Sequence, residues 1–180
     1  HDIPNTVAQA VRSAVELDVQ MLTIHTCGGL DMMRAAEDAA QEHAAKLGRP
    51  APLVLGVTVL TSMDTDDLNR VGVEHDVARQ VERLAMLAVE GGLRGLVCSP
   101  LEIEMLRGFL PHETQLVTPG IRPAGADVGD QKRILTPREA IDAGASWLVI
   151  GRPIRQPKEG SPAEAAEAIF ASITSGDSAS

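Results

Sequence analysis

The fold of this chain is indicated most clearly by the stretch Thr118-Pro119-Gly120-Ile121-Arg122-Pro123, which is followed by Gly129-Asp130-Gln131 and then by Val149-Ile150-Gly151-Arg152-Pro153. The pattern predicts a strand that ends in a Pro/Gly turn, a polar loop, a helix, and a second apolar strand that ends in Gly-Arg. In a chain of alternating strands and helices, the loop and the arginine follow neighbouring strands. Together they are suited to bind a phosphate group.

Composition narrows the class of protein. The 180 residues are 44% apolar but include only two Phe, one Trp and no Tyr, so the core must be aliphatic, as in parallel strands buried between helices. The chain is shorter than a complete eight-stranded α/β barrel, which needs roughly 250 residues. Few aromatics and a net charge of −9 argue against a nucleic-acid partner.

No apolar run is long enough to span a bilayer, so we expect no membrane contact and a cytoplasmic protein. An export or targeting segment stays open, because the chain begins at His1 without a Met.

The apolar pattern alternates along the whole chain between short β-rich runs and longer helical ones. Asn5 or Thr6 is expected to cap the first helix, and Thr136 and Ser161 each precede a Pro and lie three residues before a Glu, which predicts two more helix starts. We expect one partial barrel domain over residues 1–174 and a disordered tail over residues 175–180. Strands are predicted over residues 19–26, 53–60, 95–99, 115–118 and 147–150, and helices over residues 5–17, 30–47, 76–90, 101–110, 136–143 and 161–173.

These elements make five strand–helix units, preceded by a helix whose own strand is missing, and they predict a parallel sheet with right-handed crossovers. An open doubly wound sheet and a TIM barrel both fit this alternation. The open sheet would usually carry a G-x-G-x-x-G turn, which does not occur here. Polar or turn residues instead follow nearly every strand, which favours the barrel. These residues are His25, Thr61, Ser99, Pro119 and Arg152.

Five motifs together resemble the orotidine 5′-phosphate decarboxylase family of the bacterial type. They are His1-Asp2-Ile3-Pro4-Asn5-Thr6, Leu60-Thr61-Ser62-Met63, Thr118-Pro119-Gly120-Ile121-Arg122-Pro123, Gly129-Asp130-Gln131 and Ile150-Gly151-Arg152-Pro153. The resemblance covers nearly the whole chain. It implies a homodimeric TIM (β/α)8 barrel that converts orotidine 5′-phosphate to uridine 5′-phosphate in de novo pyrimidine biosynthesis, with no cofactor and no metal.

The hallmark of that family is the sequence Asp-x-Lys-x-x-Asp-Ile at the end of the third strand. Asp2-Ile3 matches only its last two residues, and its Lys and first Asp would precede His1. The resemblance therefore implies an incomplete barrel, from the end of the third strand through the eighth strand and the last helix. Whether this truncation is natural stays open.

The resemblance also implies the roles of the residues at the site. Asp2 would reach the active site of the partner subunit and hold the catalytic Lys charged and aimed; the alternative is a helix-capping Asp. Ile3 and Thr6 would accompany it, with Thr6 at a ribose hydroxyl. The remaining substrate contacts would be Thr61 and Pro119 at the pyrimidine, and Gln131, Gly151 and Arg152 at the phosphate.

The other reactive side chains are not expected to take part in the site. His25 is expected to be a packed residue, Cys27 and Cys98 are expected to be buried reduced thiols, and the histidines show no metal spacing. Arg122, Lys132 and Arg133 are expected to serve loop conformation or the surface. Two alternatives remain open: a sister sugar-phosphate decarboxylase or aldolase on the same barrel, and an inactive fragment that keeps only the phosphate-binding half.

Overall fold

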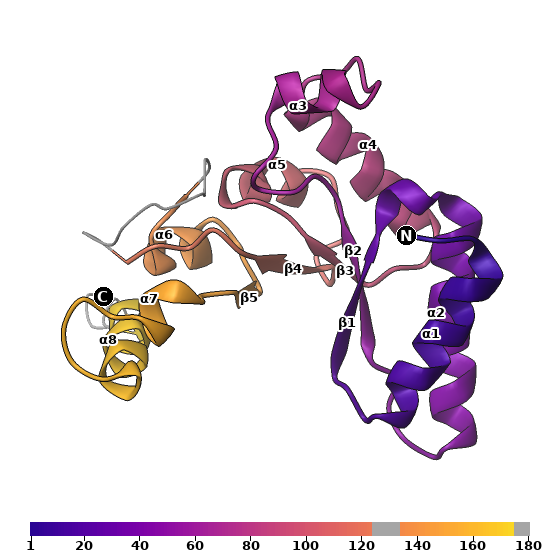
Figure 1. The fold of residues 1–180 in the computed structure, drawn as a ribbon, viewed down its shortest axis with the longest axis horizontal. Coiled ribbons are helices and arrows are strands. Elements are labelled where there is room, and N and C mark those ends of the chain that lie inside the picture. Colours follow the sequence, from indigo (N-terminus) through magenta and orange to yellow (C-terminus); the bar gives the residue numbers. More distant parts are fainter. Residues whose placement is uncertain (124–133, 175–180) are drawn as a thin grey trace.

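The computed structural model describes residues 1–123 and 134–174, and these residues form one parallel β-sheet flanked by helices (Figure 1). The strands follow one another across the sheet in chain order, β1-β2-β3-β4-β5. A doubly wound sheet reverses its strand order at a switch point, and no reversal occurs here, so that alternative is wrong. The predicted parallel α/β fold is confirmed. The strands are β1 (Met21–His25), β2 (Leu53–Val57), β3 (Gly95–Val97), β4 (Gln115–Thr118) and β5 (Trp147–Leu148).

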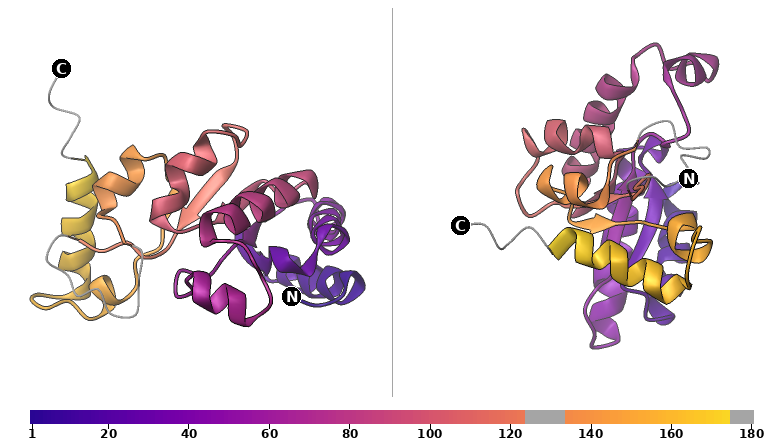
Figure 2. Two further views of the ribbon diagram at one scale, coloured as in Figure 1. Left: turned by 90° about the horizontal axis from the view of Figure 1, so that it is seen from above. Right: turned by 90° about the vertical axis from the view of Figure 1, so that its left-hand side faces the viewer.

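Helices that are close in the sequence also lie close together in the structure. Helices α1 and α2 pack side by side at the N-terminal end of the sheet, and α6, α7 and α8 gather beyond β5 at the other end (Figures 1 and 2). None of the described helices is long and apolar enough to cross a membrane. The helices are α1 (Pro4–Glu16), α2 (Leu30–Lys46), α3 (Thr65–Arg70), α4 (Val77–Glu90), α5 (Ile103–Arg107), α6 (Pro137–Asp142), α7 (Arg152–Arg155) and α8 (Pro162–Thr174), with 3-10 turns η1 (Thr26–Gly28) and η2 (Pro100–Glu102).

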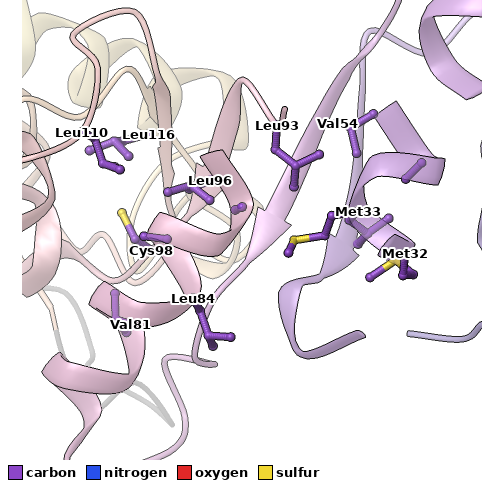
Figure 3. Close-up of a cluster of buried hydrophobic side chains, with 14 of the residues drawn as sticks. Met32, Met33, Val54, Val81, Leu84, Leu93, Leu96, Cys98, Leu110 and Leu116 are labelled. Atoms are coloured by element: carbon purple, nitrogen blue, oxygen red, sulfur yellow. The ribbon is translucent and has the colours of Figure 1, made fainter. Parts of the chain in front are cut away.

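The main core lies between the helices and one face of the sheet. Alternate strand residues point into it, since successive side chains of a strand face opposite sides. The cluster runs from Met32 and Met33 of α2 through Leu96 to Leu116, and all four side chains are fully buried (Figure 3). The core is aliphatic, as the shortage of aromatic residues predicts.

The opposite face of the sheet is covered less completely. The strand register places His25, Val57, Val97, Val117 and Trp147 in one row on this face. Trp147 is 50% exposed, and Val149, which follows β5, is equally exposed. The expectation of parallel strands buried between helices is therefore wrong for this side of β5. Trp147 instead donates its indole Nε1–H to the side-chain oxygen of Gln115 at 3.1 Å.

The predicted starts of α6 and α8 are confirmed. Glu139 accepts hydrogen bonds from the backbone and side chain of Thr136, and these bonds lower its pKa. Ser161 and Glu164 make the same reciprocal pair, which lowers the pKa of Glu164. The expected cap at Asn5 or Thr6 is wrong, because α1 starts at Pro4, whose fixed φ suits the first helical turn.

Two short helices, α3 and α7, were not predicted. The acidic stretch holds α3, where Asp64 and Asp67 cap each other's backbone N–H groups. Cys98 is buried as expected, whereas Cys27 is exposed, because it lies in the 3-10 turn beyond the end of β1. The tail expected at residues 175–180 lies outside the described residues.

Candidate active site

Because all five strands are parallel, their carboxyl ends lie along one edge of the sheet, and the predicted site residues follow those ends. His25 ends β1, Thr61 lies four residues beyond the end of β2, and Pro119 comes directly after β4. The backbone N–H of Val149 donates to the carbonyl of Thr118 at 2.9 Å, which places Pro119 beside the segment that leads to Arg152. The carboxyl ends of the strands therefore bring Thr61, Pro119 and Arg152 to the same end of the sheet.

The phosphate end of this edge is formed by Gly151 and Arg152. Gly151 precedes α7, and Arg152 is the first residue of that helix and is exposed. A Cβ atom added at Gly151 would meet nothing within 4 Å, so space lies open beside this backbone. Open space next to a guanidinium is what a bound phosphate needs. Gln131, the third predicted phosphate contact, lies outside the described residues, as do Lys132 and Arg133.

The segment after β4 is held by its own backbone contacts. Pro119 is half-buried, and Gly120 has a φ of 79°, a conformation that favours glycine. The N–H of Arg122 donates to the carbonyl of Leu135 at 2.9 Å, which joins the two chain segments that leave this edge. Arg122 is buried and its guanidinium donates to the carbonyl of Ile121 at 2.8 Å, so the alternative that it lies on the surface is wrong, and its role in loop conformation stays a prediction.

Thr61 lies in a tight turn at the same edge. The N–H of Met63 donates to the carbonyl of Leu60 at 2.9 Å, which closes the turn around Thr61 and the exposed Ser62. Thr61 is half-buried, and its hydroxyl makes no hydrogen bond with any residue that the structure describes. A half-buried hydroxyl without a protein partner is available to a ligand.

The N-terminal segment comes to this edge as well. His1 Nδ1 lies 3.2 Å from the Sγ of Cys27, which follows β1. Asp2, Ile3 and Thr6 are all exposed. Asp2 accepts a hydrogen bond from the N–H of Ile3 at 2.7 Å, but α1 has Ile3 as its N-cap and no side-chain cap hydrogen bond. The alternative role of Asp2 as the cap of α1 is therefore wrong.

Sequence reasoning missed two buried residues at this edge, Thr26 and Thr58. Each is the first residue after a strand, and each hydroxyl donates to the carbonyl that ends the next strand. Thr26 is the last residue of the strand predicted over residues 19–26, and Thr58 lies inside the strand predicted over residues 53–60, so the sequence did not mark either as a residue beyond a strand end. Within residues 1–123 and 134–174, no cluster of three or more His, Cys, Asp or Glu side chains is placed to hold a metal ion.

Comparison with known proteins agrees with this arrangement. The profile of the "Orotidine 5'-phosphate decarboxylase / HUMPS family" matches residues 1–169. The chain is 56% identical to the orotidine 5′-phosphate decarboxylase of Opitutus terrae, with 97% of this chain and 73% of that protein covered. It is 53% identical to the enzyme of the same name from Moorella thermoacetica, with 96% of this chain and 68% of that protein covered.

Solved structures give the same result. The crystal structure of orotidine 5′-phosphate decarboxylase from Lactobacillus acidophilus superposes with a TM-score of 0.82 at 35% identity, over 97% of this chain and 72% of that one. An uncharacterized conserved protein from Geobacillus kaustophilus superposes with a TM-score of 0.80 at 29% identity, over 96% of this chain and 72% of that one. This chain therefore belongs to the orotidine 5′-phosphate decarboxylase / HUMPS family.

Proposed function

We propose that this protein decarboxylates orotidine 5′-phosphate to uridine 5′-phosphate, the last step in making this pyrimidine nucleotide, at the carboxyl edge of its sheet. The observation that carries the proposal is the match of 56% identity over 97% of the chain to a protein of that name. The geometry supports it, because one edge gathers an exposed arginine beside an open glycine, an exposed carboxylate, and a hydroxyl that has no partner among the described residues.

The phosphate of the substrate binds at Gly151, Arg152 and Gln131 in this proposal. Arg152 supplies a permanent positive charge and two parallel N–H donors, and Gly151 leaves room for the phosphate oxygens beside the backbone. This contact is remote from the reacting carbon. Its binding energy helps to hold the pyrimidine where the bond breaks.

The pyrimidine lies against Thr61 and Pro119. The Thr61 hydroxyl, which lacks a partner among the described residues, gives or accepts a hydrogen bond at the base, and the half-buried ring of Pro119 offers an apolar surface. These two contacts separate a pyrimidine nucleotide from a sugar phosphate. They therefore favour orotidine 5′-phosphate over the substrates of a sister sugar-phosphate enzyme.

The chemical step breaks the bond between the pyrimidine ring and its carboxylate. The electron pair stays on the ring carbon, carbon dioxide leaves, and the lysine of the family motif delivers a proton to that carbon. Asp2 keeps the lysine charged and aimed until that transfer, since a neighbouring carboxylate stabilises an ammonium ion. No cofactor or metal takes part in this proposal.

We infer further that the working form is a homodimer of TIM (β/α)8 barrels and that residues 1–174 belong to a single domain. Support for the dimer comes from the family resemblance, which implies that Asp2 reaches the active site of the partner subunit, and Asp2 is exposed as that contact requires. Asp2, Ile3 and Thr6 of one subunit then complete the site of the other. Support for the barrel comes from the sequential parallel order of the five strands.

The variant Gly151→Ala tests the phosphate site. The added methyl group meets no neighbour within 4 Å, so the thermal midpoint is expected to stay within about 2 °C of the wild type. The methyl group would, however, occupy the space assigned to the phosphate. Isothermal titration with uridine 5′-phosphate is expected to show a loss of roughly tenfold in affinity. Unchanged affinity in the folded variant would contradict the assignment.

A further inference from the structure

Two buried threonines bind neighbouring strand ends together at the edge that carries the site. The Thr26 hydroxyl donates to the carbonyl of Val57, the last residue of β2, at 2.8 Å. The Thr58 hydroxyl donates to the carbonyl of Val97, the last residue of β3, at 3.1 Å. Both threonines are buried, at 0% and 6% exposure. Each hydroxyl therefore extends the pairing of two strands beyond the last ladder residue.

Thr58 is attached to β3 at two points. Its backbone N–H donates to the same Val97 carbonyl at 3.3 Å, beside the hydroxyl at 3.1 Å. A single hydrogen bond would let the chain pivot about the line between donor and acceptor. A second donor from the same residue restricts that pivot, because both donors must stay within reach of one oxygen. The direction in which the chain leaves β2 is thereby fixed.

The chain then reaches Thr61 by a short, constrained path. Val59 is buried at 6% exposure, and the turn from Leu60 to Met63 is closed by a 2.9 Å backbone hydrogen bond. The Thr61 hydroxyl emerges from this turn without a partner among the described residues. A small rotation at Thr58 would therefore shift the Thr61 hydroxyl relative to whatever it binds.

We propose that Thr58 is a positioning residue for substrate recognition, whose side-chain hydroxyl aims the Thr61 hydroxyl at the pyrimidine. The inference rests on the proposed function, because it takes the ligand at Thr61 to be a pyrimidine nucleotide. Thr58 does not touch the substrate; it acts through the direction of residues 59–61. The Thr61 hydroxyl is placed correctly only while Thr58 holds both of its hydrogen bonds.

Thr26 supplies a matched control. Its hydroxyl makes the same kind of hydrogen bond one strand away, and it is also buried, but it begins the 3-10 turn of residues 26–28 and does not lead to the turn that holds Thr61. Thr26→Val and Thr58→Val each remove one hydroxyl and keep the side-chain shape. A loss that is only structural should affect both variants in the same way.

The readout is the ratio of the dissociation constants for ribose 5-phosphate and uridine 5′-phosphate, measured by titration calorimetry. Both ligands carry the phosphate, and only the nucleotide carries the base. Thr58→Val is expected to lower this preference for the nucleotide roughly fivefold, as the loss of one well-placed hydrogen bond would. Thr58→Ser, which keeps the hydroxyl, and Thr26→Val are expected to keep the wild-type ratio.

A second comparison shows whether Thr58 acts through Thr61. In a Thr61→Val background, Thr58→Val is expected to cause no further loss of preference, because the hydroxyl that it aims is gone. Thr58→Ala replaces Thr58→Val throughout if the valine variant does not fold. An unchanged ratio in Thr58→Val, an equal fall in Thr26→Val, or an additive loss in the double variant would each overturn the inference. A wild-type protein without preference for the nucleotide would instead overturn the proposed function.

Discussion

The guanidinium of Arg107 donates a 3.0 Å hydrogen bond to the hydroxyl oxygen of Ser146, and the same oxygen accepts a second hydrogen bond of 3.0 Å from the backbone N–H of Leu116. Arg107 also donates to the carbonyls of Gly144 at 2.9 Å and Thr114 at 2.8 Å. It therefore joins α5 to the start of β4 and to the turn that leads into β5. This contact lies at the end of the sheet opposite to the candidate site.

The first prediction concerns Arg107→Lys. A lysine has one ammonium group and cannot reach all four acceptors of the Arg107 guanidinium, which are the Ser146 hydroxyl and the carbonyls of His112, Thr114 and Gly144. The free energy of unfolding in urea is expected to fall by about 2 kcal/mol, because partly buried acceptors lose their donors. Affinity for uridine 5′-phosphate, measured in the absence of urea, should stay near the wild-type value. A variant as stable as the wild type would show that these hydrogen bonds contribute little.

Gly56→Ala is expected to destabilise the core. A Cβ atom at this position would lie 2.7 Å from Cγ2 of Thr26, which is fully buried and held by its hydrogen bond to Val57. Overpacking of this kind costs about 1–3 kcal/mol in thermal or urea unfolding. The control for stability is Gly151→Ala, where an added Cβ atom would meet nothing within 4 Å. An equal loss of unfolding free energy in the two variants would contradict the fixed position of Thr26.

Acid should weaken the starts of α6 and α8. Hydrogen bonds from Thr136 lower the pKa of Glu139 below its ordinary value of 4.5, and hydrogen bonds from Ser161 lower the pKa of Glu164. A carboxylate whose pKa is lowered on folding stabilises the protein above its unfolded pKa, and this contribution is lost as the pH falls below about 4.5 through the folded value. Glu139→Gln combined with Glu164→Gln is expected to show a smaller fall in thermal midpoint between neutral and acidic pH. An identical acid response in the double variant would contradict the assignment.

Mixed dimers test the shared site. If Asp2 of one subunit completes the site that contains Arg152 of the other, Asp2→Asn and Arg152→Ala each inactivate both sites of their own dimer. A mixed dimer of the two variants keeps one intact site. Equal mixing makes about half of the dimers mixed, so about a quarter of all sites are intact and activity is expected to return to about a quarter of the wild-type value. Dilution after mixing should not abolish the restored activity. Mixtures that stay inactive would place Asp2 and Arg152 in the site of one subunit.

The sequence predicted those elements whose signals are local. Strand β4 has the predicted bounds, and the start of α6 follows from Thr136, Pro137 and Glu139 alone. Helices α3 and α7 were missed because six and four residues are too few to show a helical period. The predicted strand over residues 53–60 ends at Val57, because its neighbour β3 has only three residues with which to pair.

The candidate site was predictable in part for the same reason. Motifs placed Thr61, Pro119, Gly151 and Arg152 after strands, and the parallel order brings those strand ends to one edge. The part played by Thr58 was not visible, because it depends on a carbonyl group of a different strand. A hydrogen bond between segments far apart in sequence leaves no periodic signal in either of them.

Decarboxylation is the direct test of the proposed function. The purified protein would be given orotidine 5′-phosphate, and formation of uridine 5′-phosphate and carbon dioxide would be followed with no metal or cofactor added. We expect equal amounts of both products. In Asp2→Asn the rate is expected to fall roughly a hundredfold or more, because the variant lacks a group that supports proton transfer. A folded protein that binds uridine 5′-phosphate but releases no carbon dioxide would contradict the account.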